Sequence, residues 1–291
     1  MVFDNEKDFE SAVINHIRRY GWDKYEVINY PTEADLIKNW ADILSQNNKD
    51  IDTLNDQPLT ETEMAQVLEQ LNACRTPLEV NGFINGKGVT ITRDNPADKL
   101  HLHKEVVLDV YDRRKIDAGE SVYQIARQPR FEARDEIFPN RRGDFMLLVN
   151  GMPVIHVELK KSGVDVKVAC NQIETYSHEG IFAQGIFSLV QVFVAMNPTE
   201  TVYFANPGQD GMFDPHYFFH WADTNNKQVN EWDEVVKELL NIPMAHQLIG
   251  YYTVADKQDG VLKVMRSYQY YAASFIQTRV ANRNNWQHAD R

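Results

Sequence analysis

Residues 141–160 read RRGDFMLLVNGMPVIHVELK, and this stretch decides the fold. Apolar runs on both sides of Asn150–Gly151 predict two β-strands, because Asn-Gly is the favoured pair for a type I′ hairpin turn. Residues 164–177 follow with helical spacing and contain NQIETY at positions 171–176. The sequence therefore predicts a β-hairpin followed directly by a helix.

Three charged side chains of the hairpin are candidates for one site. Alternate residues of a strand point to opposite faces, so His156, Glu158 and Lys160 share a face of the second strand. Asp144 opens the first strand. We leave His156 out of the predicted catalytic set, because a single strand histidine is more often a hydrogen-bonded structural group.

The register of the hairpin decides whether the carboxylates meet. A two-residue turn pairs Val149 with Met152 and leaves Asp144 on the wrong face from Glu158. A shift of one residue, from a three-residue loop or a bulge near Pro153, sets Asp144 opposite Glu158. Proline cannot donate to the strand ladder, which favours a bulge there. We therefore predict an irregularity in this hairpin.

With that shift, the site has the composition of a phosphodiesterase. Asp144 and Glu158 are predicted to share Mg²⁺, or Mn²⁺, with the backbone carbonyl of Leu159 as a further ligand. A cation there would acidify a bound water and polarise the phosphoryl oxygen. Lys160 would orient the attacking water or neutralise the phosphate. Such a site is typical of a metal-dependent nuclease.

Other side chains are predicted to support this site. Gln172 and Tyr176 share a helix face and would bond the scissile phosphate or a nearby base. Arg142 and Lys161 are predicted to bind substrate, and Glu10 on the first helix is an auxiliary carboxylate. The simpler interpretation is that such charges make surface ion pairs, worth under about 1 kcal/mol each. The hairpin, its apolar strands and the helix that follows occur together, and this combination favours a catalytic site over surface ion pairs.

Composition limits the classes of protein that fit. The 291 residues carry a net charge of −12, which argues against a broad non-specific grip on DNA. The two cysteines fit neither a disulfide framework nor a zinc site. There is no leader at the start, and the apolar run 181–196 is too short to cross a membrane. These features predict a soluble, cytoplasmic protein. The basic residues near the hairpin are Arg127, Arg130, Arg134, Arg141, Arg142, Lys160, Lys161 and Lys167.

Outside the hairpin, periodicity predicts the remaining elements. The first helix is capped by Asp4 or Asn5 and stopped by Gly21, and a second, over 59–75, has a capping box at Thr60 and Glu63. Pro243 is expected to begin a linker. Further helices are expected at 229–240 and 262–280, and strands at 89–92, 105–110, 122–126, 187–195 and 202–205.

The chain resembles the amino-terminal part of the restriction (R) subunit of type I restriction-modification enzymes. Residues 143–161 followed by 171–176 are similar to the PD-(D/E)xK nuclease core of that family with its Gln-x-x-x-Tyr helix, and residues 9–22 resemble the start of those subunits. The family usually has proline where this chain has Gly143. The resemblance implies an α/β, restriction-endonuclease-like fold, with a central mixed sheet flanked by helices.

The last residues resemble the entry to a helicase-type motor, although Ser267 replaces a usual proline. There, Arg266 and Gln269 are implied to help hold the adenine of ATP. The implied domains are a nuclease over 1–255, and a linker with the first motor helix over 256–291. No Walker motif occurs, so ATP would act only in the full-length subunit, and these residues are expected to be a fragment or a truncated product.

The resemblance implies a Mg²⁺-dependent DNA endonuclease that cuts after ATP-driven translocation. Its implied partners are double-stranded DNA and the modification and specificity subunits. Two alternatives stay open. One is a non-catalytic docking module of the same assembly, and the other is a PD-(D/E)xK nuclease of the repair or resolvase type, against which residues 262–272 argue.

Overall fold

A six-stranded mixed sheet forms the centre of the molecule, in the order β1-β4-β7-β8-β9-β10. The computed structural model describes residues 2–86, 88–111, 121–133, 138–209, 211–256 and 260–281. Two strand pairs are parallel, β1 with β4 and β8 with β9, and the others are antiparallel. The α/β architecture with a central mixed sheet is thus confirmed. The strands are β1 (Ile28–Asn29), β4 (Tyr123–Arg127), β7 (Phe145–Val149), β8 (Met152–Leu159), β9 (Val192–Asn197) and β10 (Glu200–Ala205).

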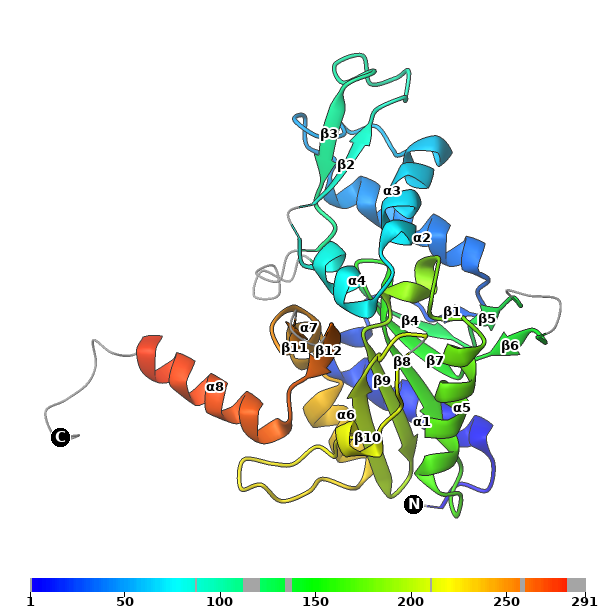
Figure 1. Ribbon diagram of the computed structural model, residues 1–291, viewed down its shortest axis with the longest axis vertical. Coiled ribbons are helices and arrows are strands. Elements are labelled where there is room, and N and C mark those ends of the chain that lie inside the picture. Colours follow the sequence, from blue (N-terminus) through cyan, green and yellow to red (C-terminus); the bar gives the residue numbers. More distant parts are fainter. Residues whose placement is uncertain are drawn as a thin grey trace, which may run out of the picture.

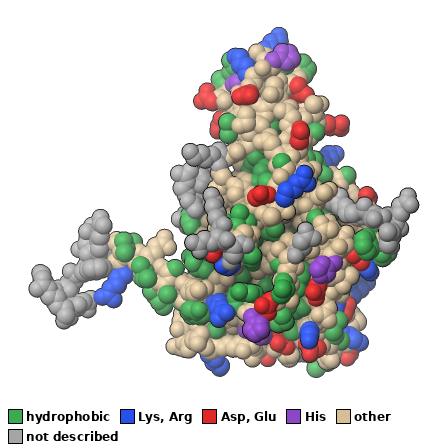
Figure 2. All heavy atoms as spheres, in the orientation of Figure 1, with side chains coloured by type: hydrophobic (Ala, Val, Ile, Leu, Met, Phe, Trp, Pro, Cys, Tyr) green, Lys and Arg blue, Asp and Glu red, His purple; other side chains and the backbone are tan. Residues whose placement is uncertain are grey.

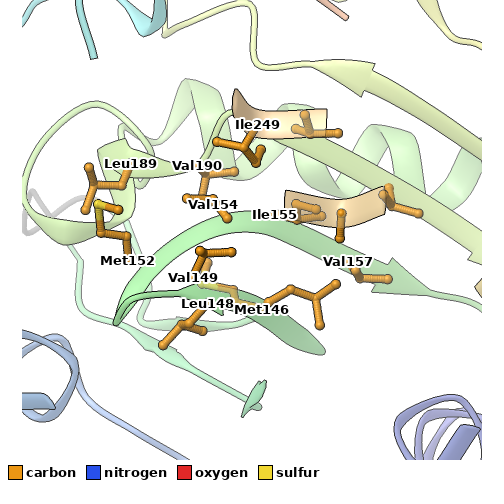
Figure 3. Close-up of a cluster of buried hydrophobic side chains, with 14 of the residues drawn as sticks. Met146, Leu148, Val149, Met152, Val154, Ile155, Val157, Leu189, Val190 and Ile249 are labelled. Carbon is orange, nitrogen blue, oxygen red and sulfur yellow. The ribbon is translucent and has the colours of Figure 1, made fainter. Parts of the chain in front are cut away.

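Strand β8 lies in the middle of the core, and all eight of its residues are buried. Figure 3 shows its apolar side chains packed among those of β7 and of the segment that leads into β9. Burial of each large aliphatic side chain contributes about 1.5–3 kcal/mol. The strand that carries Glu158 is therefore held firmly on both sides.

The hairpin between β7 and β8 contains the predicted irregularity. Asn150 and Gly151 form the turn with φ of 51° and 82°. Val154 then pairs with no residue of β7, because the register shifts by one at this point. Asp144 is consequently level with Glu158 on the same face, which confirms the register argument. The pairs around the shift are Val149 with Met152, Leu148 with Pro153, Leu147 with Ile155 and Phe145 with Val157.

Helices lie on both faces of the sheet (Figure 1). Helix α5 (Val166–His178) connects β8 to the parallel strand β9 and packs along both strands. In Figure 1, α5 lies in front of the sheet, and α1 (Glu6–Ile17) lies behind it. Helix α1 also packs against α6 (Trp232–Leu239). The side chain of Asn5 caps α1, as the sequence predicts.

Helix α1 ends earlier than predicted. The expected end was Gly21, but the regular helix stops at Ile17, and Arg18–Trp22 forms a wider turn. Within that turn Tyr20 and Gly21 leave helical geometry. A Cβ on Gly21 would lie 2.7 Å from the Cβ of Ile242, so the later chain is close enough to bend this segment.

A second group of elements forms a lobe that projects from the sheet (Figure 1). Its helix α3 begins with the predicted capping box, in which the side chains of Thr60 and Glu63 each bond the other residue's backbone N–H. The lobe also contains a buried ion network centred on Arg93. Its elements are α2 (Glu33–Asn47), α3 (Glu61–Ala73), α4 (Pro77–Ile84), β2 (Val89–Thr92) and β3 (Glu105–Leu108).

The ion network gives a test of the stability of this lobe. Arg93 and Glu63 are fully buried, and their side chains meet at 2.5 Å. Glu63→Ala leaves that guanidinium without one of its partners, which typically costs about 3–5 kcal/mol. We expect urea unfolding to show a loss of that size. The matched control is Glu69→Ala on the exposed side of α3, for which we expect a change within about 0.5 kcal/mol. Equal midpoints for the two variants would contradict the role of the network.

The carboxyl-terminal elements differ from the expectation. Of the strand expected over 187–195, only Val192 onward is strand, and Ile186–Leu189 is a 3₁₀ turn. Helix α7 (Met244–Gly250) follows Pro243, where a linker was expected. The pattern over 262–280 is divided between a strand and a helix. Its parts are β12 (Val261–Val264), which pairs with β11 (Thr253–Asp256), and α8 (Ser267–Ala281).

Helix α8 packs on the core through Tyr270 and Tyr271 near its start, and its later turns project away from the molecule (Figure 1). Only Ser267 of this helix is buried, and Phe275 and Ile276 are 62% and 65% exposed. The hairpin β11–β12 before it lies across the expected domain boundary at residue 256, and β12 contacts β10. Residues 282–291 of the expected second domain lie outside the described residues. None of the described helices has the length and apolar character needed to span a membrane.

Candidate active site

Asp144 and Glu158 meet where β7 begins and β8 ends. The Asp144 Oδ2 accepts a hydrogen bond of 2.6 Å from the backbone N–H of Leu159. Glu158 is 1% exposed. The bulge therefore brings the two predicted carboxylates together, with Glu158 buried and Asp144 partly exposed.

This arrangement is electrostatically unfavourable for two ionised carboxyl groups. Burial raises the pKa of Asp144 well above its usual range, and the neighbouring Glu158 raises it further. Burial likewise raises the pKa of Glu158 to about 8, and Lys160 opposes this rise. A bound cation would favour both ionised forms, because an opposite charge nearby lowers a carboxyl pKa.

The donor atoms at this point suit a hard cation. Carboxylate and carbonyl oxygens are the ligands that Mg²⁺ takes in proteins, and Mg²⁺ keeps several waters. Across the described residues, no cluster of three His, Cys, Asp or Glu side chains is placed to hold a metal. A cation here would thus take two side-chain ligands, from Asp144 and Glu158. The carbonyl of Leu159 is the third protein donor in the predicted set.

Lys160 reaches the same site from the end of β8. Its side chain is nearly buried, and its Nζ lies 3.9 Å from Glu158 Oε1 and 3.7 Å from Glu6 Oε1. Glu6 was not among the predicted residues. It lies one helical turn before Glu10 on the same helix, and this i, i+4 spacing was the signal that could have identified it.

Glu10 is close to the site but already has partners. Its carboxylate pairs with the Arg127 guanidinium and accepts a 2.8 Å hydrogen bond from Gln128 Nε2. Glu10 is 3% exposed, and its charge contributes to the raised pKa of Asp144. It therefore acts on the site at a distance, through its charge.

Gln172 and Tyr176 come together on α5 as expected. Gln172 Nε2 donates to the Tyr176 hydroxyl at 2.6 Å, and that hydroxyl donates to the backbone carbonyl of Arg142 at 3.0 Å. Tyr176 is buried, and its pKa is raised by burial and by the charge of Glu158. The pair thus ties α5 to the segment that leads into Asp144.

The basic residues near the site differ in exposure and in pairing. Arg142 and Lys161 are exposed, whereas Arg141 pairs with Glu179 at 2.6 Å. Arg134 lies outside the described residues. On the face drawn in Figure 2, Lys and Arg side chains are interspersed with Asp and Glu and form no continuous basic surface.

Arg266 and Gln269 lie in another part of the molecule. The Arg266 guanidinium stacks 4.5 Å from the centre of the Phe219 ring, and Gln269 Oε1 accepts from the Arg266 backbone N–H at 2.9 Å. Both line a largely apolar cavity of about 630 Å³, between β10, the segment 211–219 and the β11–β12 hairpin. The cavity includes neither Asp144 nor Glu158 in its lining.

Comparison with known proteins gives one consistent result. The sequence model described as "Type I restriction enzyme R protein N terminus" matches residues 4–211. The SsaAORF53P endonuclease subunit of Staphylococcus saprophyticus is 29% identical over 280 residues, which cover 95% of this chain and 27% of that protein. The SauMSSORF170P endonuclease subunit of Staphylococcus aureus is 27% identical over 290 residues, 98% of this chain and 28% of that protein.

A shorter relative is similar over most of its own length. The EcoprrI endonuclease subunit of Escherichia coli is 28% identical over 264 residues, covering 85% of this chain and 82% of that protein. Each of the three is named as an endonuclease subunit of a type I restriction enzyme. The family match covers well over half of the chain. The chain therefore belongs to the family of type I restriction enzyme R protein N termini.

Proposed function

We propose that this chain is the Mg²⁺-dependent DNA endonuclease module of a type I restriction enzyme R subunit, with a PD-(D/E)xK core. The observation that carries the proposal is the bulged hairpin, which sets Asp144 level with Glu158 and beside Lys160. The names of the relatives support the same activity. Asp144, Glu158 and Lys160 are the catalytic residues in this proposal.

Each residue of the proposed site would have a separate role in phosphodiester hydrolysis. Asp144, Glu158 and the carbonyl of Leu159 would hold Mg²⁺, or Mn²⁺ in its place. When bound, such a cation lowers the pKa of a water and stabilises charge on the phosphoryl oxygens. The Leu159 N–H fixes the orientation of Asp144. The Lys160 ammonium, held between Glu158 and Glu6, is placed to neutralise charge on the phosphate.

The rim of the site would bind double-stranded DNA. Arg142 and Lys161 are exposed and would bond phosphate oxygens, which position a backbone without reading sequence. Gln172 would add a hydrogen bond, while Tyr176 holds the strand in place. With a net charge of −12, the chain would bind DNA weakly alone. Modification and specificity subunits would supply most of the DNA binding in a cytoplasmic complex.

The remaining proposals concern the full-length subunit. The two staphylococcal relatives are more than three times as long as the matched region, so most of their length lies outside it. We propose that residues 1–255 form the nuclease domain, and that 256–291 link it to an ATP-driven motor whose first helix is α8. Arg266 and Gln269 would then contact adenine in the full subunit.

The competing proposal is a docking module without catalysis. The projecting end of helix α8, with its exposed Phe275 and Ile276, is the feature that favours it. Titration calorimetry with Mn²⁺ separates the two. We expect wild type to bind Mn²⁺, and Asp144→Ala to lose this binding while it unfolds at a similar temperature. A wild-type chain that binds no Mn²⁺ would refute the nuclease proposal and favour docking.

A further inference from the structure

His156 is a fully buried histidine beside one of the proposed metal ligands. It lies on β8 two residues before Glu158, and its Nε2 is 3.2 Å from Glu158 Oε2. Its other nitrogen, Nδ1, has no hydrogen-bond partner among the described residues. Among the described residues, the one hydrogen-bond partner of this side chain is therefore the carboxyl group of Glu158.

Packing fixes the orientation of the His156 ring. Four aromatic rings from other segments of the fold surround it, with centroid separations between 5.3 and 6.2 Å. On its remaining side, a Cβ at Gly143 would lie 2.6 Å from His156 Cε1. Gly143 thus leaves the space that the imidazole occupies. The surrounding rings are those of Phe131, Tyr176, Phe182 and Phe193.

The position of the imidazole proton follows from these contacts. Nε2 faces the Glu158 carboxyl group, whereas Nδ1 faces no hydrogen-bond acceptor among the described residues. A proton on Nδ1 would be a buried donor without an acceptor, which costs about 1–3 kcal/mol. A proton on Nε2 is donated to Glu158 instead. The Nε2–H tautomer is therefore favoured.

We propose that His156 is a positioning residue that holds Glu158 Oε2 through an Nε2–H hydrogen bond and leaves Oε1 directed at the cation and at Lys160. This inference rests on the proposed function, because it concerns the ligand set of that site. Partners that orient a metal ligand typically change metal affinity by 10–100-fold when they are removed. The aromatic surroundings and Gly143 would fix the imidazole so that the carboxylate does not rotate.

The test compares three substitutions by Mn²⁺ titration of the whole chain. The amide nitrogen of glutamine is as many bonds from Cα as His156 Nε2, whereas that of asparagine matches Nδ1. We expect His156→Gln to bind Mn²⁺ within a few-fold of wild type. His156→Asn and His156→Leu should bind about 10-fold more weakly. Without metal, the unfolding temperatures of the Gln and Asn variants should not differ in the way that their Mn²⁺ affinities do.

A second measurement needs no variant and no metal. Nitrogen-15 NMR of the wild-type imidazole at a pH above 8, where the Glu158 carboxyl is ionised without a metal, should show a proton on Nε2 and an unprotonated Nδ1. A proton on Nδ1 would overturn the inference, as would equal Mn²⁺ affinity in all four proteins. If wild type itself binds no Mn²⁺, the proposed function fails and the inference fails with it. Binding by wild type that is insensitive to His156 overturns the inference alone.

Discussion

Asp144→Asn is expected to abolish DNA cleavage by the reconstituted restriction enzyme. Asparagine keeps the size of the side chain, and its oxygen still accepts from the Leu159 N–H, but it contributes no negative charge to a cation. Losing one of two carboxylate ligands should remove several kcal/mol of stabilisation from the reaction, which corresponds to about 10³-fold in rate. The measurement is plasmid cleavage with Mg²⁺, ATP and the partner subunits.

A matched control makes the result specific. Asp42→Asn makes the same chemical change on an exposed position of α2, and it should cut at the wild-type rate. Assembly with the partner subunits should be intact for both variants. Cleavage by Asp144→Asn at a rate near that of the control would show that the reaction does not depend on this carboxylate.

Lys160→Ala is expected to reduce cleavage by about 10²–10³-fold, because it removes the ammonium group that would stabilise charge developing on the phosphate. The carboxylates and the Leu159 carbonyl remain in place, so Mn²⁺ binding should persist. This combination separates Lys160 from Asp144, whose loss should affect both measurements. Plasmid cleavage and calorimetry on the same preparation would test it.

Lys161 provides the comparison for Lys160. It is the next residue, but its side chain is exposed and its Nζ donates to the backbone carbonyl of Asp4 at 3.2 Å. Its proposed role is a single phosphate contact at the rim, so Lys161→Ala should weaken cleavage by less than tenfold. Equal losses for the two alanine variants would argue against a special place for Lys160.

The hairpin shows what a sequence pattern can determine. The alternation of side chains and the position of Pro153 were sufficient to predict the register shift, because both act within twenty residues of chain. The pairing found in the structure, with Val154 as the extra residue, confirms that argument. The caps of α1 and α3 were predictable for the same reason, since capping groups lie three residues apart.

Long-range contacts account for what the sequence pattern did not reveal. The apolar run after Gly185 fits either a buried strand or a buried turn, and only its packing against β8 separates the two. The contact of His156 with Glu158 depends on aromatic rings distant in the chain. The pairing of Glu10 with Arg127, 117 residues later, is likewise a tertiary contact.

The most direct test of the shared cation site is anomalous diffraction from crystals of the chain grown with Mn²⁺. We expect one strong peak between the carboxylates of Asp144 and Glu158, with the Leu159 carbonyl among the ligands and Lys160 close by. Full Mn²⁺ occupancy elsewhere, with no peak between these two carboxylates, would contradict it.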